Sequence, residues 1–231
     1  MKDKNDKVEE SKKYIFIKLQ NILKELNINN NKKRYIIGVS GIPGSGKTTF
    51  VNQIVNEFNE QCHKNGHKNI PCIAISMDGF HLPKSKLDKQ MYLRRGACYT
   101  FDSYKFLSFL KHLKNESNKI IKAPSFEHKI ADPVEDDIVI ELYHKLIIIE
   151  GIYLHLKNPS PWNEISSLFD EKWFIPINID EARYRVGKRH YNSNLVNSIE
   201  EGIIKFDNND ILNAEFILNN RDENVLNIDF N

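Results

Sequence analysis

The chain has 231 residues, 40% of them hydrophobic, and its 33 Lys and Arg against 31 Asp and Glu leave a formal net charge of +2. This length suits one globular α/β domain with a short appendage. The near-neutral balance argues against a nucleic-acid-binding protein that works by bulk positive charge. The three cysteines, Cys62, Cys72 and Cys98, have no CxxC spacing, so neither a disulfide framework nor a zinc site is expected.

The N-terminal residues MKDKNDKVEESKK are charged where a signal peptide would need an apolar segment. The sequence also contains no apolar run of roughly eighteen residues, the length that a membrane-spanning helix requires. We therefore expect a cytoplasmic protein without a membrane partner.

Apolar residues recur at three- and four-residue spacing over residues 8–26, which predicts an amphipathic helix that ends at the Asn-rich turn 27–31. We expect residues 1–30 to form this helix and to pack on a domain made by residues 31–231.

Four short apolar runs rich in β-branched residues predict buried strands, at 35–39, 70–76, 145–149 and 172–179. Helix-compatible stretches alternate with these runs, at 47–59, 103–113, 162–169 and 180–191. Such alternation predicts an α/β protein with a parallel sheet. The stretch 120–142 contains Pro124 and Pro133 and predicts small antiparallel strands inserted beside that sheet.

A complete GxxxxGK[ST] motif lies between the first predicted strand and the following helix. Its glycines let backbone N–H groups turn toward phosphate oxygens, and the helix N-terminus adds a favourable partial charge. Lys47 would reach the β- and γ-phosphates, and the Thr48 hydroxyl would bind Mg²⁺. The residues expected to hold the nucleotide are Gly41, Ile42, Pro43, Gly44, Ser45, Gly46, Lys47, Thr48 and Thr49.

Two acidic residues follow predicted strands, at the edge where α/β sheets bind their ligands. Glu150 ends the strand 145–149 and resembles a Walker B acid with Glu in place of Asp, which predicts a metal ligand. Asp78 follows the strand 70–76 and is expected to act as a proton acceptor or to contact Mg²⁺. The alternatives are a solvated acid at a strand end for Glu150 and a turn-capping role beside Gly79 for Asp78.

Several further motifs occur in a characteristic order. They are MDGFHLP (77–83), RRGACYTFD (94–102), PSFEH (124–128), IEGIYL (149–154), WNEISSLFDEKWF (162–174), RVGKRH (185–190) and NDILNA (209–214). With the GxxxxGK[ST] loop they resemble the uridine kinase, phosphoribulokinase and pantothenate kinase group of P-loop kinases. The resemblance implies an NMP-kinase-like parallel five-stranded sheet flanked by helices, with a lid at about residues 181–200.

The resemblance also implies roles for individual residues. Asp78 would accept the proton of the acceptor hydroxyl, and lid arginines would neutralise the transferred phosphoryl group. Arg183, Arg185 and Arg189 cannot all lie on one helix face, and Arg185 and Arg189 are the expected pair. Segments that line the acceptor pocket in similar kinases contain His81, Arg95, Tyr99, Asp102, His128 and Tyr153, although a structural polar role is open for each.

This chain departs from the family pattern at three places. Glu127 stands where Asp is usual, Ile152 stands where Asn is usual, and residues 191–194 lack the glycine that commonly follows the Arg-His pair. The first two departures lie near the expected pocket, so the acceptor of a relative cannot be transferred to this chain.

The leading functional hypothesis is transfer of phosphate from ATP, with Mg²⁺, to a hydroxyl of a small molecule such as uridine, a sugar or a pantothenate-like acceptor. Neither nucleic acid nor a membrane is expected as a partner, and a homodimer is left open. The alternative is a regulatory or assembly ATPase that uses hydrolysis as a switch. A degenerate kinase retained for binding alone is disfavoured because Lys47, Thr48, Asp78 and Glu150 are all present.

Overall fold

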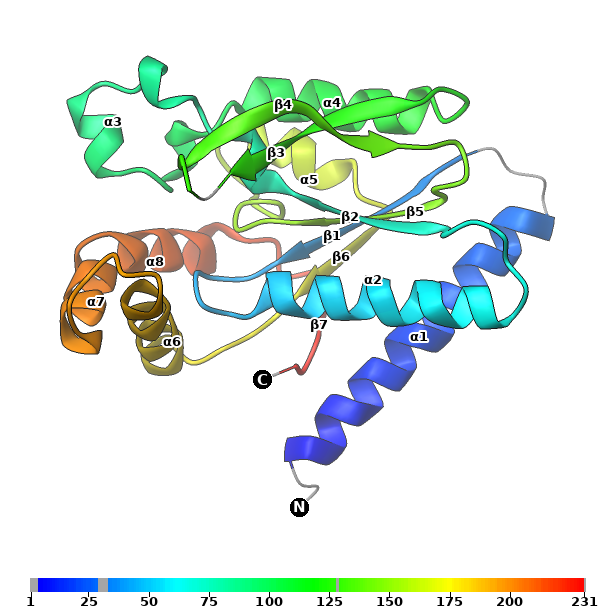
Figure 1. The fold of residues 1–231 in the computed structure, drawn as a ribbon, viewed down its shortest axis with the longest axis horizontal. Coiled ribbons are helices and arrows are strands. Elements are labelled where there is room, and N and C mark those ends of the chain that lie inside the picture. Colours follow the sequence, from blue (N-terminus) through cyan, green and yellow to red (C-terminus); the bar gives the residue numbers. More distant parts are fainter. Residues whose placement is uncertain (1–3, 29–32, 128, 231) are drawn as a thin grey trace.

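The computed structural model of the protein describes residues 4–28, 33–127 and 129–230. Within them, a five-stranded parallel sheet in the order β2-β5-β1-β6-β7 forms the centre (Figure 1). Its strands are β1 (Tyr35–Ser40), β2 (Cys72–Ser76), β5 (Leu146–Glu150), β6 (Glu171–Phe174) and β7 (Leu226–Asn227). The predicted α/β architecture is confirmed.

The two central strands are apolar because both faces of the sheet are covered. Every residue of β5 is buried, and so is every residue of β1 after Tyr35. A strand covered on both faces reads as a continuous apolar run instead of an alternating one. This explains why the run at 145–149 is so clear in the sequence.

Helices cover the two faces of the sheet as separate layers (Figure 1). On one face lie α1 (Lys4–Ile28) and α2 (Lys47–Lys64), where Ile15 and Leu19 share an apolar cluster with Phe50 and Phe58. On the other face lie α4 (Ser103–Asn115) and α5 (Trp162–Ser167). The expected N-terminal helix is present as α1, whereas the expected boundary at residues 30 and 31 lies outside the described residues.

A two-stranded antiparallel sheet, formed by β3 (Ile121–Glu127) and β4 (Asp132–Ile140), lies beside the main sheet. This confirms the inserted strands expected at 120–142. The turn that follows β2 packs closely on β3, because a Cβ atom at Gly79 would lie only 2.3 Å from the carbonyl oxygen of Pro124. A short helix, α3 (Lys89–Leu93), precedes the RRGACYTFD segment.

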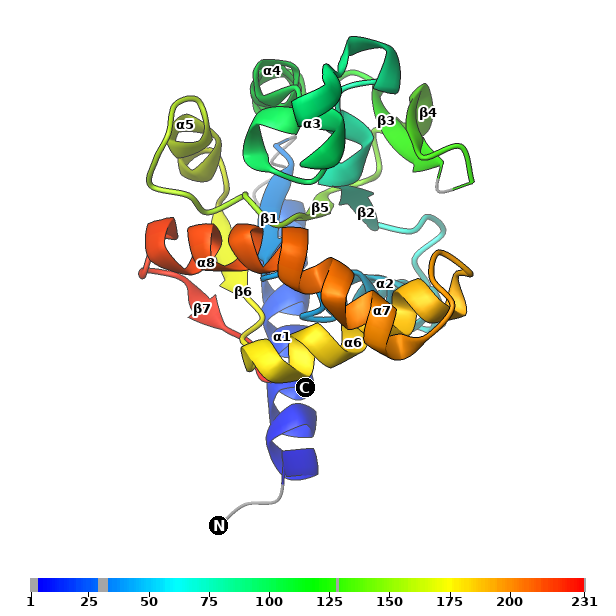
Figure 2. The same ribbon diagram turned by 90° about the vertical axis from the view of Figure 1, so that its left-hand side faces the viewer.

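The C-terminal elements gather at one end of the sheet (Figure 2). They are α6 (Ile179–Asn192), α7 (Ile199–Lys205), a π-helical turn (Phe206–Asp210) and α8 (Ile211–Asn220). The sequence patterns did not predict α7, α8 or β7. The strand expected at 172–179 was too long, because β6 ends at Phe174 before Pro176, and Asn178 caps α6 by accepting from the Asp180 N–H at 2.8 Å. The helix expected at 47–59 was too short, since α2 continues to Lys64.

The described residues also bear on the membrane and cysteine predictions. None of their helices combines the length and apolar character needed to cross a bilayer. Cys62 and Cys72 are buried free thiols, and Cys98 is a half-buried free thiol.

Gly38, in the middle of β1, provides a test of the packing. A Cβ atom there would lie 2.7 Å from Cε1 of His155 and 2.9 Å from the Phe169 ring. His155 is itself fixed, because its Nε2 donates to the carbonyl oxygens of Gly38 (3.0 Å) and Trp173 (3.1 Å). We expect Gly38→Ala to lower the free energy of unfolding by about 1–3 kcal/mol in denaturant titrations. An increase, which the lower backbone entropy of Ala would otherwise produce, would contradict this packing.

Candidate active site

The phosphate-binding loop 41–48 connects β1 to α2. Gly44 and Gly46 have φ values of 83° and 82°, a left-handed conformation that glycine adopts without strain. Gly46 caps α2 without a side-chain hydrogen bond, so the first turn of the helix, with Lys47, Thr48 and Thr49, presents backbone N–H groups for an anion. The predicted phosphate-binding residues therefore lie together as a loop followed by a helix N-terminus.

A cavity of about 250 Å³ lies between this loop and α6. It is lined by Gly44, Gly46, Lys47, Thr48 and Thr49 from the loop and α2, and by Arg185, Val186 and Arg189 from α6. The four-residue spacing of the two arginines places both on the face that looks at the loop.

Arg183 is directed elsewhere, because its guanidinium pairs with both carboxylate oxygens of Asp207. Arg185 also pairs with Glu181 at 2.5 Å. The structure thus brings the expected pair, Arg185 and Arg189, to the cavity.

Glu150 lies at the end of β5, level with Val39 of β1 and Ser76 of β2. Its side chain is buried, and its Oε1 accepts a hydrogen bond of 2.7 Å from the Ser76 hydroxyl. Burial raises the pKa of Glu150, whereas the Lys47 ammonium lowers it, and hydrogen bonds from Ser76 and Thr48 favour the charged form. The acid therefore reaches the phosphate-binding loop directly through Thr48.

Asp78 lies in the turn immediately after β2 and is half-buried. Its backbone N–H donates to the Ser76 hydroxyl at 3.2 Å, so Ser76 joins the Asp78 turn to Glu150. Both carboxylates act on Lys47. Burial lowers the pKa of the Lys47 ammonium, whereas the two acids raise it. Ser76 did not emerge from the sequence, in which only its position before Met77-Asp78 could have pointed to it.

The oxygen ligands at this edge suit Mg²⁺. Mg²⁺ is usually held by one or two carboxylates together with waters and substrate phosphates. Glu150, Asp78 and the Thr48 hydroxyl supply such oxygens. Across the described residues, no group of three or more His, Cys, Asp and Glu side chains could enclose a metal ion by itself. The oxygens of Glu150, Asp78 and Thr48 therefore fit Mg²⁺ as ligands.

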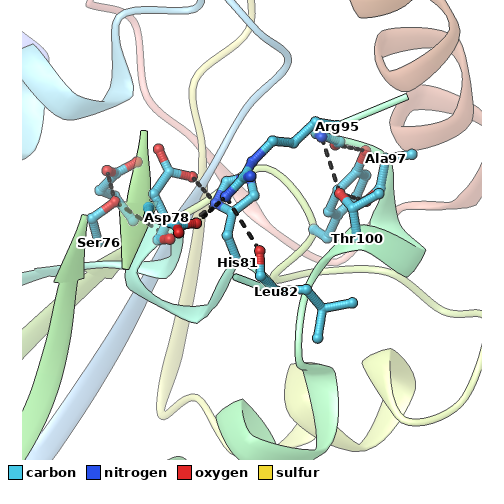
Figure 3. Close-up of polar contacts among 11 residues, drawn as sticks. Ser76, Asp78, His81, Leu82, Arg95, Ala97 and Thr100 are labelled. Carbon is cyan, nitrogen blue, oxygen red and sulfur yellow. Dashed lines mark hydrogen bonds and ion pairs between the residues drawn. The ribbon is translucent and has the colours of Figure 1, made fainter. Parts of the chain in front are cut away.

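His81 and Arg95 lie on the side of Asp78 that is away from Ser76 (Figure 3). Nδ1 of His81 is 2.9 Å from the carbonyl oxygen of Asp78 and 3.8 Å from its Oδ1. Since a carbonyl can only accept, Nδ1 carries the proton, and burial lowers the pKa of His81 and favours the neutral ring. Arg95 extends from the 94–102 segment toward these residues and donates to the carbonyl oxygen of Leu82 (3.2 Å) and to Asp132 Oδ1 (3.1 Å).

Other residues expected in the acceptor pocket have different surroundings. Tyr153 is only 1% exposed, and its hydroxyl donates to the carbonyl oxygen of Gly96 at 2.7 Å. Tyr153 thus supports the 94–102 segment from within the core, and its place in the acceptor pocket stays a prediction. Asp102 caps α4 by accepting from the Lys105 N–H at 3.0 Å. Tyr99 is exposed, and His128 lies outside the described residues.

Comparisons with known proteins agree with this geometry. Residues 36–184 match the model of the Phosphoribulokinase / Uridine kinase family. A uridine kinase-like protein of Schizosaccharomyces pombe, C227.14, is 38% identical over 82% of this chain and 80% of its own length. ATP-dependent kinase YFH7 of Vanderwaltozyma polyspora is 34% identical over 83% of this chain, which spans 62% of that relative.

A structural comparison finds the same fold. The crystal structure of YFH7 from Saccharomyces cerevisiae superposes with a TM-score of 0.78, covering 92% of this chain and 98% of that one at 23% identity. At this identity the likeness is one of fold. With the family match over residues 36–184 and the geometry at the ends of β1, β2 and β5, the chain belongs to the phosphoribulokinase and uridine kinase family of P-loop kinases.

Proposed function

We propose that the protein transfers the γ-phosphoryl group of Mg²⁺-bound ATP to a hydroxyl group of a small, polar metabolite. The observation that carries this proposal is the link through Ser76 between two acids in unlike surroundings. Glu150 is buried beside Thr48, whereas Asp78 is half-buried beside His81. One acid is thus suited to the metal side of the transfer and the other to the acceptor side.

The nucleotide side of the mechanism is mainly positioning and charge stabilisation. The loop amides and Lys47 would hold the phosphates, while Thr48 and Glu150 would hold Mg²⁺. A metal ion held by these oxygens would offset the negative charge of the phosphates. Arg185 and Arg189, in a lid at about residues 181–200, would stabilise the charge on the phosphoryl group in flight.

On the acceptor side, Asp78 would orient the attacking hydroxyl and accept its proton. His81 and Arg95 would bind other polar groups of the acceptor, with Tyr99 at the exposed rim. A neutral His81 with its proton on Nδ1 leaves Nε2 as a hydrogen-bond acceptor, which suits a hydroxyl or an amide N–H of the substrate. Nucleosides, sugars and pantothenate-like acids all carry such groups.

A regulatory ATPase is the second candidate, and the arginines of α6 argue against it. A switch ATPase often takes its catalytic arginine from a partner. Here Arg185 and Arg189 line the same cavity as Lys47 and Thr48 in one chain.

A coupled ADP-release assay over nucleosides including uridine, sugars, sugar acids and pantothenate tests the proposal, with acceptor-free hydrolysis as the baseline. We expect at least one compound to raise ADP release well above that baseline and to gain a phosphate detectable by mass spectrometry. Lys47→Ala is the inactive control, because it removes the phosphate-binding ammonium. ATP hydrolysis that no acceptor stimulates would favour the regulatory ATPase.

Asp78→Asn separates proton transfer from nucleotide binding. The amide keeps the shape of the carboxylate but cannot accept the hydroxyl proton, so we expect kcat to fall by on the order of 10² or more. The Kd for Mg²⁺-bound ATP should change by only a few fold, as measured by calorimetry. An unchanged acceptor-stimulated rate at saturating ATP would assign the base elsewhere, with Glu150 as the next candidate.

Chelation of Mg²⁺ tests the metal side. EDTA should weaken ATP binding, because the uncompensated phosphate charge then faces Glu150. Glu150→Gln should reduce the difference between ATP affinities measured with Mg²⁺ and with EDTA, and Glu57→Gln, on the exposed side of α2, should preserve it. ATP affinity that is indifferent to EDTA in the unaltered protein would contradict the metal assignment.

A further inference from the structure

The π-helical turn Phe206–Asp210 lies between α7 and α8 and contacts parts of the molecule that are distant in sequence. π-Helical turns are rare and occur frequently at functional sites. On one side, Asp207 accepts both hydrogen bonds of Arg183 from α6. The turn is therefore attached to the helix that carries Arg185 and Arg189.

On its other side the turn holds Arg94, the first residue of the 94–102 loop. Nη1 of Arg94 donates to the backbone oxygen of Asn209 at 3.0 Å and also to its side-chain oxygen, while Nη2 donates to Asn213 Oδ1 at 3.1 Å. Asn209 returns a hydrogen bond of 3.1 Å from Nδ2 to the carbonyl oxygen of Arg95. Arg94 therefore donates from two nitrogens of one planar guanidinium, a geometry that a single ammonium group cannot reproduce.

The neighbouring residue, Arg95, faces the acceptor side. Its backbone oxygen is bound by Asn209, whereas its side chain reaches Asp132 and Leu82 near His81 (Figure 3). The backbone that follows Arg95 is also held in place, because the carbonyl oxygen of Gly96 accepts a hydrogen bond from the Tyr153 hydroxyl. The π-helical turn and the acceptor side are thus joined through one peptide unit.

Asp210, the last residue of the turn, lies within electrostatic reach of cations at the phosphate site. Burial raises the pKa of this carboxyl group, and the nearby cations that lower it come from α6, α7, the 94–102 loop and α2. In order of their effect they are Arg189, Lys205, Arg94 and Lys47. Nucleotide phosphates at the phosphate-binding loop would attract Lys47 and Arg189. Their binding would therefore change the balance of charge around Asp210.

We propose that Arg94 is a positioning residue that couples the phosphate site to the acceptor side, by holding the 94–102 loop on the π-helical turn. Nucleotide binding then orders Arg95 beside Asp78 before the acceptor arrives. The catalytic meaning of this coupling rests on the proposed function, but the coupling itself is measurable without an acceptor.

Hydrogen–deuterium exchange with and without the Mg²⁺ complex of AMP-PNP, an ATP analogue that is not hydrolysed, tests the coupling. The amides of Gly96, Ala97 and Thr100 are hydrogen-bonded within the loop, so their exchange reports its opening. In the unaltered protein we expect nucleotide to slow exchange at 94–102 by roughly tenfold, in addition to slowing it at 41–49. Arg94→Lys should keep the protection at 41–49 and lose it at 94–102.

The control is Asp88→Ala, which removes the cap that accepts from the Met91 N–H at the start of α3 but leaves the Arg94 contacts intact. It should retain the nucleotide response at 94–102. Asn209→Ala removes the side chain that binds Arg94 and the Arg95 carbonyl oxygen. This variant serves as the test if Arg94→Lys does not fold. The double variant should lose at least as much of the response as either single variant, because Arg94 also binds Asn213 and Asn209 also binds the Arg95 carbonyl oxygen.

The proposal is overturned if the 94–102 loop of the unaltered protein does not respond to nucleotide, or if both Arg94→Lys and Asn209→Ala respond as fully as the unaltered protein does. Activity provides a separate readout. With an accepted substrate, Arg94→Lys should raise the acceptor KM by more than it changes the Kd for ATP. A protein that shows the coupling but phosphorylates no acceptor would contradict the proposed function and leave the coupling standing.

Discussion

The site depends on the register of three parallel strands. Val39 of β1 and Ser76 of β2 both lie level with Glu150 of β5. Because the strands are parallel, their carboxyl ends open at one edge, and three separate stretches of chain deliver their next residues there. The phosphate-binding loop, the Asp78 turn and Glu150 meet for this reason, although more than a hundred residues separate the first from the last. A slip of one residue in β5 would turn Glu150 to the opposite face of the sheet.

Burial then makes the two acids at this edge unlike each other. Glu150 is enclosed, so its charge is tolerated because Lys47 and two hydroxyl groups stabilise it. Asp78 is half-buried in a turn that Gly79 allows to pack on β3. The apolar layers on both faces of the sheet therefore position the two acids, and leave Glu150 enclosed and Asp78 half-buried.

The sequence predicts the elements whose signals are local. The phosphate-binding loop has an unmistakable motif, and the fully buried β5 is a continuous apolar run, so their positions and the two acids that follow strands could be read directly. The surroundings of Tyr153 and Asp102 could not, because the same residue types serve pockets, loops and caps. The structure shows a long-range contact of Tyr153 with Gly96 and a local helix cap at Asp102. The π-helical turn has no simple periodicity, and the short β7 is held by its pairing with β6. Ser76 and Arg94 act through partners far away in sequence, which one sequence does not reveal.

The close fit of Gly44 against α6 has a mechanical consequence. A Cβ atom on Gly44 would lie 2.7 Å from the carbonyl oxygen of Ala182 and 2.9 Å from Val186 Cγ2, so the loop backbone and the start of α6 touch directly. If α6 tilted, it would pivot about this contact. Arg185 lies between these two contact residues, whereas Arg189 lies about 4.5 Å beyond Val186 along the helix axis, at 1.5 Å per residue. A tilt about this contact would therefore move Arg189 farther than Arg185, so the two cations would respond unequally to the same motion of α6.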